Sequence, residues 1–241
     1  MIFKSLAKQR TEPDFPYEVI RTNRKKSASI KIEEGKVKVI IPKTLSQKRL
    51  EQLVKEKTPW VRKKLREYAE YQPVKPKEYV SGECFTYLGR NYRLKLVSGD
   101  SEQVKLKQGQ FVLGVNKDLS SDKLAGLVRD SLLEWYFTHA KERLIEKTQR
   151  YAKIIGIEPT SVMVKSYRSR WGSCSSKGDI SYNWKIIIAP HHIVDYVVVH
   201  ELCHLKHHDH SPAFWKSVEQ VIPDYRECRE WLKVNGLKLE I

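Results

Sequence analysis

The sequence predicts an α+β protein, because segments with strand periodicity and segments with helical periodicity follow one another along its 241 residues. Residues 28–42 (ASIKIEEGKVKVIIP) alternate apolar and polar side chains on both sides of a turn that contains glycine. Residues 121–156 carry apolar side chains at helical spacing. Two strand-like runs, 161–167 and 179–190, then precede a second helical segment.

The first eighty residues predict a β-rich module with a helical pair. The hairpin over 28–42 can accept residues 17–22 (YEVIRT) as a third strand. Residues 46–71 are helical in pattern, and Pro59 predicts a break there, because proline suits the first turn of a helix and not its interior. We expect a linker at 72–82, which holds two prolines and a glycine, and therefore a boundary between domains 1–80 and 81–241.

The second region opens with two more predicted hairpins, at 85–97 (FTYLGRNYRLKLV) and 104–115 (VKLKQGQFVLGV). The long helix that follows has Ser121 placed to cap its start and Gly156 placed to end it. Residues 168–178 (RSRWGSCSSKG) are expected to form a loop between the two strand-like runs.

Charge is spread unevenly along the chain. The net charge is +16, and residues 1–80 hold 21 lysines and arginines against 10 acidic residues, whereas the remaining 161 residues hold 24 against 19. A basic front half suggests a polyanionic partner such as nucleic acid or a nucleotide, and a solvated surface is the alternative explanation.

The four cysteines are scattered without a CxxC pair, which argues against a disulfide framework. No apolar run reaches the roughly 18 residues that a membrane helix needs. The first residues lack the apolar core of a signal peptide. We therefore expect a cytoplasmic protein with no membrane partner.

Seven of the eight histidines lie between residues 191 and 210. His200 and His204 are four residues apart, so on a helix both imidazoles point to one side. Glu201 follows the first of them. In this HExxH arrangement the histidines ligate zinc and the glutamate is the general base. Composition alone predicts roughly 0.02 chance matches, so the pattern points to a metal site.

A catalytic zinc normally takes three protein ligands, and His207, His208 and His210 are the nearby candidates for the third. His208 continues the spacing of four residues, so an unbroken helix would favour it. The choice therefore depends on where the helix ends.

Ser211 is a natural N-cap and Pro212 suits the first position of a new helix, so the first helix is expected to end before them. A turn would then bring His210 back to the ion. Because no glycine is available, Asp209 or His208 would have to adopt the left-handed conformation. The spacing favours His210 over the other two candidates.

Together these stretches resemble the YgjP-like family of small zinc metallopeptidases. The family is grouped with the zincins, and its catalytic segment is similar to that of the SprT-like proteases. The resemblance covers most of the chain, and the residues that carry it are RWGSCSSKGDISYNWKIIIAP (170–190), VDYVVVHELCHLKHHDHSPAFW (194–215), IPDYRECREWL (222–232), KVKVIIPKTLS (36–46) and FTYLGRNYRLKLV (85–97).

The resemblance implies a zincin-like metallopeptidase domain with Zn²⁺ at His200, His204 and His210, with Glu201 catalytic. It implies peptides or unfolded proteins as substrates. His207 stands where the metzincin pattern has glycine, so the turn of that family is not carried over.

During hydrolysis a negative charge develops on the carbonyl oxygen of the substrate, and a hydrogen-bond donor is needed to stabilise it. The candidates for this donor are Tyr225, Tyr182 and Arg170, and we expect Tyr225 to act together with Glu201 in catalysis. Residues 178–186 (GDISYNWKI) are expected to form an edge strand to which an extended peptide adds.

Two other functions compete with a peptidase. The same zinc site could hydrolyse nucleoside triphosphates to release pyrophosphate, which would suit the basic front half, although no GxxxxGK[ST] loop is present. A nucleic-acid-associated protease is the other alternative. A purely structural zinc site would need four closed ligands, and no cysteine is suitably spaced for one.

Overall fold

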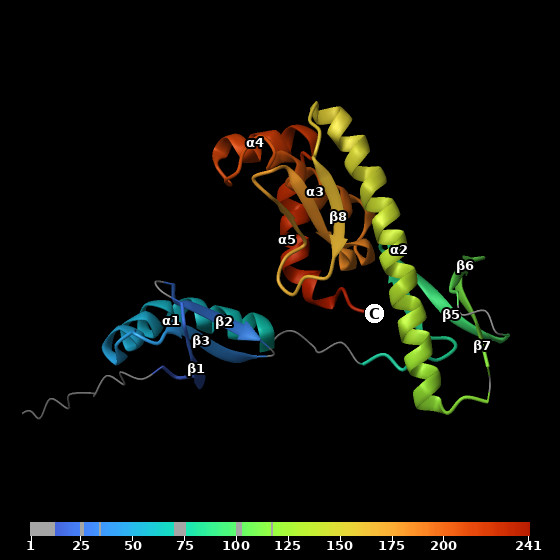
Figure 1. Cartoon of the computed structure of the whole chain (residues 1–241), viewed down its shortest axis with the longest axis horizontal. Coiled ribbons are helices and arrows are strands. Elements are labelled where there is room, and N and C mark those ends of the chain that lie inside the picture. The colour runs from blue at the N-terminus through green and yellow to red at the C-terminus, as the bar shows by residue number, and fades with distance from the viewer. Residues whose placement is uncertain (1–12, 25–26, 34, 70–75, 100–102, 117) are drawn as a thin grey trace, which may run out of the picture. The chain divides into compact units, whose positions relative to one another are not determined.

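The computed structural model describes residues 13–24, 27–33, 35–69, 76–99, 103–116 and 118–241 (Figure 1). Contacts divide the chain into two compact units, Met1–Val74 and Lys75–Ile241, and each has its own apolar core. Residues 72–75 of the expected linker lie outside the described residues. Among the described helices, none combines the length and apolar character that crossing a bilayer requires.

The first unit contains a three-stranded sheet whose strands are β1 (Tyr17–Thr22), β2 (Ser29–Glu33) and β3 (Lys36–Pro42), in the order β1-β3-β2. The predicted hairpin is confirmed, because β2 and β3 pair antiparallel. The predicted third strand also pairs, in parallel with β3. Val37, Val39 and Ile41 alternate along β3 and are buried, as the period of two requires.

Helix α1 (Gln47–Ala69) covers this sheet and runs through Pro59 without a break, so the prediction of two helices is wrong. Leu50, Val54 and Val61 lie on both sides of the proline and are buried in one core. An interior proline costs about 3 kcal/mol. Burying each of these aliphatic side chains returns about 1.5–3 kcal/mol, so packing prevails over the local preference.

The second unit begins with a four-stranded sheet in the order β4-β5-β7-β6. Both predicted hairpins are confirmed as antiparallel pairs. Their two-residue turns, Leu88–Gly89 and Gln108–Gly109, have positive φ at both positions, as a type I′ turn requires. The strands are β4 (Cys84–Tyr87), β5 (Arg90–Ser98), β6 (Lys105–Lys107) and β7 (Gln110–Val115).

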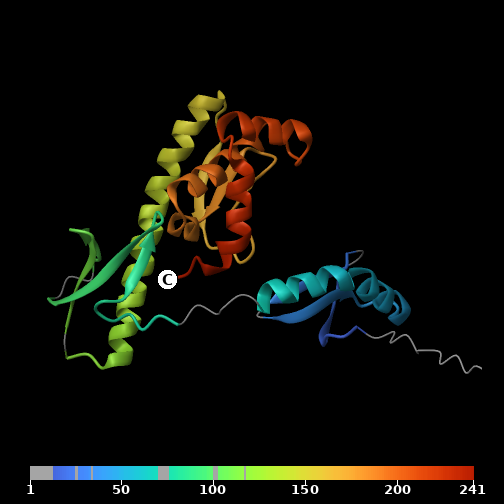
Figure 2. The ribbon, with the colours of Figure 1, turned by 180° about the vertical axis from the view of Figure 1, so that it is seen from behind.

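Helix α2 (Ser121–Ile155) runs past both sheets of the second unit (Figures 1 and 2). Gly156 ends it as predicted, with φ of 70° and its N–H bonded to the carbonyl of Ala152 at 2.9 Å. Ser121 is not the cap: the residue before it, Ser120, has the extended backbone of an N-cap, so the helix already includes Ser121.

The second sheet of this unit has the order β8-β10-β9 and contains β8 (Ser161–Lys165), β9 (Gly172–Cys174) and β10 (Asp179–Asn183). The predicted strand over 179–190 is therefore too long. Its second half is the 3₁₀ helix η1 (Trp184–Ile188), which the side chain of Asn183 caps by accepting a hydrogen bond from the N–H of Lys185.

Strand β9 lies inside the segment predicted as a loop, where small residues allow it to pair antiparallel with β10. As a result β10 is central in the sheet, and the prediction that it forms an edge is wrong. Within the described part of the chain, the edge strand on that side is β9.

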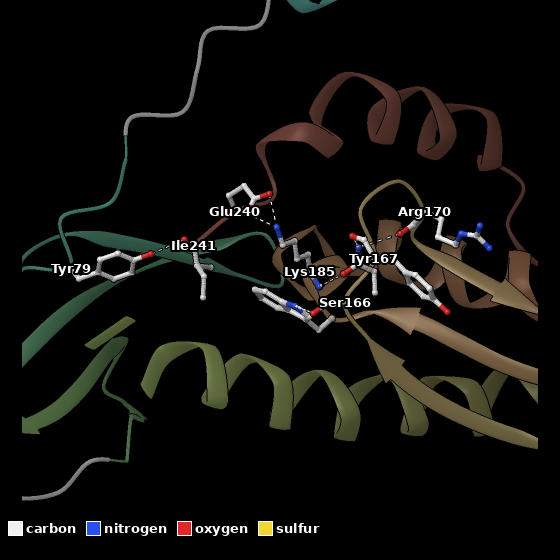
Figure 3. A network of polar contacts seen from close by, with 9 residues as sticks. Tyr79, Ser166, Tyr167, Arg170, Lys185, Glu240 and Ile241 are labelled. Carbon is white, nitrogen blue, oxygen red and sulfur yellow. Dashed lines mark hydrogen bonds and ion pairs between the residues drawn. The ribbon is translucent and has the colours of Figure 1, made fainter. Parts of the chain in front are cut away.

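Three helices complete the unit: α3 (His191–Cys203), α4 (Pro212–Val221) and α5 (Tyr225–Asn235). Helix α3 packs against α2, α4, α5 and β9 and is buried on most sides. After α5 the chain is tied back to the unit, because the hydroxyl of Tyr79 donates to the carbonyl of Ile241 at 3.0 Å and Lys185 pairs with Glu240 (Figure 3).

The turn between β4 and β5 supports the start of α3. The N–H groups of Leu88 and Gly89 donate to the carbonyls of Ile187 and Ile188, at 2.7 and 3.2 Å. A Cβ at Gly89 would lie 2.8 Å from the Cα of Pro190, the residue that precedes α3. Glycine is required here by its φ and also by this close approach.

We predict that Gly89→Ala lowers the free energy of unfolding by about 2–4 kcal/mol, because the methyl group must displace Pro190. Gly109→Ala is the matched control: this glycine holds the same turn position with φ of 73° and has no atom within 4 Å of its Cβ site. The control should lose about 1 kcal/mol from backbone strain alone. Denaturant unfolding of both variants measures the difference, and equal losses would contradict the packing argument.

Candidate metal centre

Helix α3 supplies the first two histidines of the site. His200 lies in its last turn, and His204 is the residue that caps its C-terminal end, with helical backbone. One helical turn separates the two residues, so their rings face the same side with centroids 5.0 Å apart. The helix thus delivers both imidazoles of the HExxH pattern together.

The chain turns directly after α3. The N–H groups of Lys206 and His207 both donate to the carbonyl of Cys203, at 3.1 and 3.0 Å, and Asp209 then accepts from the N–H of Ser211 at 3.2 Å. Neither His208 nor Asp209 has positive φ, so the expectation that one of them adopts the left-handed conformation is wrong. The chain after α3 turns through hydrogen bonds of helical type, without a residue in the left-handed conformation.

The start of α4 is as predicted, with Ser211 as N-cap and Pro212 in the first turn. The hydroxyl of Ser211 accepts a hydrogen bond from the N–H of Phe214 at 3.4 Å. This brings the fully buried ring of Phe214 against all three imidazoles, with centroids 5.0 Å from His200, 4.5 Å from His204 and 4.9 Å from His210.

His200, His204 and His210 form a cluster that fits a zinc ion. One ring nitrogen from each lies within 4.8 Å of the others. The Nε2 atoms of His200 and His210 are 3.2 Å apart. Two nitrogens bound to one tetrahedral zinc at its usual bond length would be about 3.4 Å apart, so the separation matches a shared ion.

The other ring nitrogen of His204 is already engaged: its Nδ1 bonds the carbonyl of His207 at 3.0 Å. Such a bond fixes the tautomer and leaves Nε2 for a metal. His207 itself contacts the hydroxyl of Ser217 at 3.2 Å, and His208 is exposed. Of the three candidates for the third ligand, His210 is the one that the chain brings to His200 and His204.

Burial and the neighbouring histidines lower the pKa of His200 to about 3, so its imidazole is neutral at neutral pH, as a metal ligand must be. Its Nδ1 is buried and has no hydrogen-bond partner among the described residues.

Glu201 is buried beside this cluster, with 6 % of its surface exposed. A Cβ on Gly172 would lie 2.6 Å from both Cγ and Oε1 of Glu201, so β9 crosses the carboxyl group at a distance that glycine alone allows. In the metal-free site, burial raises the pKa of Glu201 to about 8, and the nearby charge of Arg170 lowers it in part. A zinc ion beside the carboxyl group would lower this pKa further and favour the carboxylate. The sequence pattern placed Glu201 beside the metal but gave no sign of this close strand.

A pocket of about 350 Å³ opens next to His200 and Glu201. Of the three candidate donors, Arg170 lines it. Tyr182 is fully buried and bonds Thr148, away from the pocket lining. Tyr225 lies behind Trp215, its ring stacked on the indole at 5.1 Å. The lining residues are Arg170, Trp171, Gly172, Tyr196, Val197, His200, Glu201, Arg229, Leu232 and Lys233.

The sequence prediction missed several lining residues, among them Tyr196 and Arg229. Tyr196 lies four residues before His200 on α3, and that spacing was a signal for a shared face. Arg229 lies on α5, and only the packing of α5 against α3 brings it to the pocket. No local pattern indicates such a contact.

Hydrogen bonds from Asn183, a buried residue with 3 % of its surface exposed, hold the segment that carries Arg170 and Gly172. Its side-chain amide donates to the carbonyls of Tyr167 and Arg170 at 3.0 and 3.2 Å, and its backbone N–H donates to Trp171 at 2.8 Å. Figure 3 shows Tyr167 and Arg170 in this segment above the strands. A buried amide thus sets the position of the loop that faces Glu201.

A cluster of three imidazoles beside a buried carboxyl group and an open pocket is the arrangement of a metallohydrolase. The family model of the YgjP-like metallopeptidase domain matches residues 26–235. The chain belongs to this family, which confirms the resemblance drawn from the sequence. Membership implies metal-dependent peptidase chemistry with a divalent ion, commonly zinc.

Among solved structures, the chain is similar to the crystal structure of the metallopeptidase zymogen of Pyrococcus abyssi abylysin. The two are 24% identical, with a TM-score of 0.35, over 38% of this chain and 94% of that chain. Among curated proteins no match was found.

We predict that His210→Ala weakens zinc binding by at least about 100-fold, more than the loss of an outer partner costs, because one of three ligands is removed. His208→Ala is the matched control, since His208 is exposed two residues earlier and should leave affinity unchanged. Calorimetric titration of the metal-free variants with zinc measures both. Equal affinity in the two variants would remove His210 from the ligand set.

Proposed function

We propose that the chain hydrolyses peptide bonds at a zinc ion held by His200, His204 and His210, with Glu201 as the general base. The observation that carries this proposal is the meeting of three imidazole nitrogens within 4.8 Å beside a buried carboxyl group. Zinc, when bound, supplies Lewis-acid chemistry: it makes a water molecule acidic and polarises a carbonyl oxygen.

Glu201 is proposed to take the proton from the attacking water at a carboxylate oxygen and to pass it to the nitrogen of the leaving amine. Burial and the contact with β9 restrict this carboxyl group to one position. A restricted base needs no reordering during the reaction, which favours proton transfer in both directions.

An extended peptide is proposed to pair with β9, because this edge strand passes Glu201. Strand β10 pairs with one edge of β9, and the peptide would pair with the opposite edge. Backbone hydrogen bonds would then hold the substrate, whatever its side chains. The strand that the sequence favoured for this role, β10, is central in the sheet, so the role passes to its neighbour.

Tyr225 stays the proposed donor to the developing oxyanion. Its ring stacks on Trp215, which in turn stacks on His210 at 5.5 Å. Its hydroxyl accepts a hydrogen bond from Nε of Arg226 at 3.1 Å, and its own O–H stays available to donate to the substrate.

We predict that Glu201→Gln keeps its zinc and loses hydrolysis by about 10²–10⁴-fold, because the proton carrier is removed while the ligands remain. The measurement is a mass-spectrometric screen of products from an unfolded protein mixture and a panel of nucleoside triphosphates, with wild type beside the variant. New peptide termini made by wild type alone are expected. Release of pyrophosphate with peptides untouched would favour the nucleotide alternative instead.

We also predict that Gly172→Ala lowers peptide hydrolysis by about 100-fold while zinc stays bound, because its methyl group must push Glu201 or β9 aside. Gly126→Ala is the control: this glycine lies inside α2 and has no atom within 4 Å of its Cβ site. That change should raise stability by up to about 1 kcal/mol and leave activity as it is. Full activity in Gly172→Ala would refute the close approach.

A further inference from the structure

The pocket beside Glu201 has an excess of positive charge. Three basic side chains line it, Arg170 from the segment before β9 and Arg229 and Lys233 from α5. The one acidic residue in the lining is Glu201. Because Glu201 is assigned to the reaction, any carboxylate that pairs with the three basic residues must come from outside the lining of the pocket.

Lys233 has one such counter-charge, because its ammonium group pairs with Glu230 at 2.8 Å. The two arginines contact aromatic rings instead: the guanidinium of Arg229 lies 5.0 Å from the ring centre of Trp215, and that of Arg170 lies 5.6 Å from the ring centre of Tyr167. Within the described parts of the chain, no carboxylate lies within ion-pair distance of either guanidinium.

The rest of the lining is largely apolar and comes from Trp171, Tyr196, Val197 and Leu232. A volume of about 350 Å³ accepts one or two side chains. Arg229 and Leu232 are three residues apart on α5, so one helix face presents a charge and an apolar surface together. This combination suits a group with a short apolar stem that ends in an anion.

We propose that this pocket binds a carboxylate of the peptide substrate, held by Arg229 together with Arg170, and so selects substrates with an acidic group close to the cleaved bond. The carboxylate comes either from a glutamate or aspartate side chain or from the free C-terminus of the peptide. This inference rests on the proposed peptidase function and names its substrate class.

Arginine suits the role because its planar donors bind both oxygens of a carboxylate. Contact with the aromatic rings orients the two guanidinium groups and leaves their N–H donors available for the substrate. The side chains are thus oriented before a substrate arrives, which lowers the entropy lost on binding.

The test uses the full-length, zinc-loaded protein and peptides that differ at one position, glutamate or glutamine, each with a free or an amidated C-terminus. Wild type is expected to cleave the acidic peptides with a kcat/KM about tenfold or more above that of their neutral partners, as a charged hydrogen bond gives. Preference for glutamate assigns the pocket to a side chain, and preference for the free acid assigns it to the C-terminus.

Arg229→Gln should lose this preference, so that its kcat/KM for the acidic peptides falls to that for the neutral ones, with its zinc retained. Arg229→Lys should keep part of the preference, because it keeps the charge. Arg150→Gln is the control, since it removes an exposed arginine of α2 that does not line the pocket. Wild type without preference for acidic peptides, or Arg229→Gln with it, would overturn the inference and leave the peptidase proposal standing.

Binding provides a readout that does not need turnover. A fluorescent peptide with glutamate should bind zinc-loaded Glu201→Gln at least about tenfold more tightly than its glutamine partner, and adding Arg229→Gln should abolish the difference. If wild type cleaves no peptide but hydrolyses nucleoside triphosphates in a manner that depends on Arg229, both the inference and the peptidase proposal fail.

Discussion

The candidate site depends on the packing of three imidazoles around one buried phenylalanine. Phe214 is fixed by the first turn of α4, whose cap is Ser211, so the turn that ends one helix and the cap that begins the next decide where His210 lies. The ring also supports His200 and His204 from α3. Contact with this ring limits how the three imidazoles can rotate, and the hydrogen bond of His204 to the carbonyl of His207 adds to that restraint.

Strand β9, which is three residues long, bounds the site at Glu201. Strand β9 approaches Glu201 so closely that a methyl group would not fit, and Asn183 holds the segment before it. The carboxyl group of Glu201, the proposed general base, is therefore positioned by close contact with the backbone of β9. Among the described residues, no carboxylate lies within ion-pair distance of Arg170 or Arg229, which is the reason that we assign these arginines to the substrate.

The sequence predicted the features that local chemistry determines. The hairpins, the glycine that ends α2, the cap and proline of α4 and the helix with its two histidines all follow from patterns within a few residues. The errors arise where tertiary packing overrides such patterns. Pro59 stays inside α1 because both halves of the helix share one core, and β9 forms because β10 lies beside it. Arg229 reaches the pocket through helix packing that no short pattern encodes.

Helix α2 links the metal centre to a sheet far from it. At 35 residues it is about 52 Å long. Tyr136 in its middle donates to the carbonyl of Thr86 in β4, and about three turns further along, Lys147 donates to the carboxylate of Asp195 in α3. Buried side chains of α2 and of both sheets belong to one continuous apolar core, so the two sheets unfold together. Zinc bound at the end of α3 would therefore raise the melting temperature of the hairpins as well. In the reverse direction, a change that destabilises the distant sheet would lower the affinity for the metal.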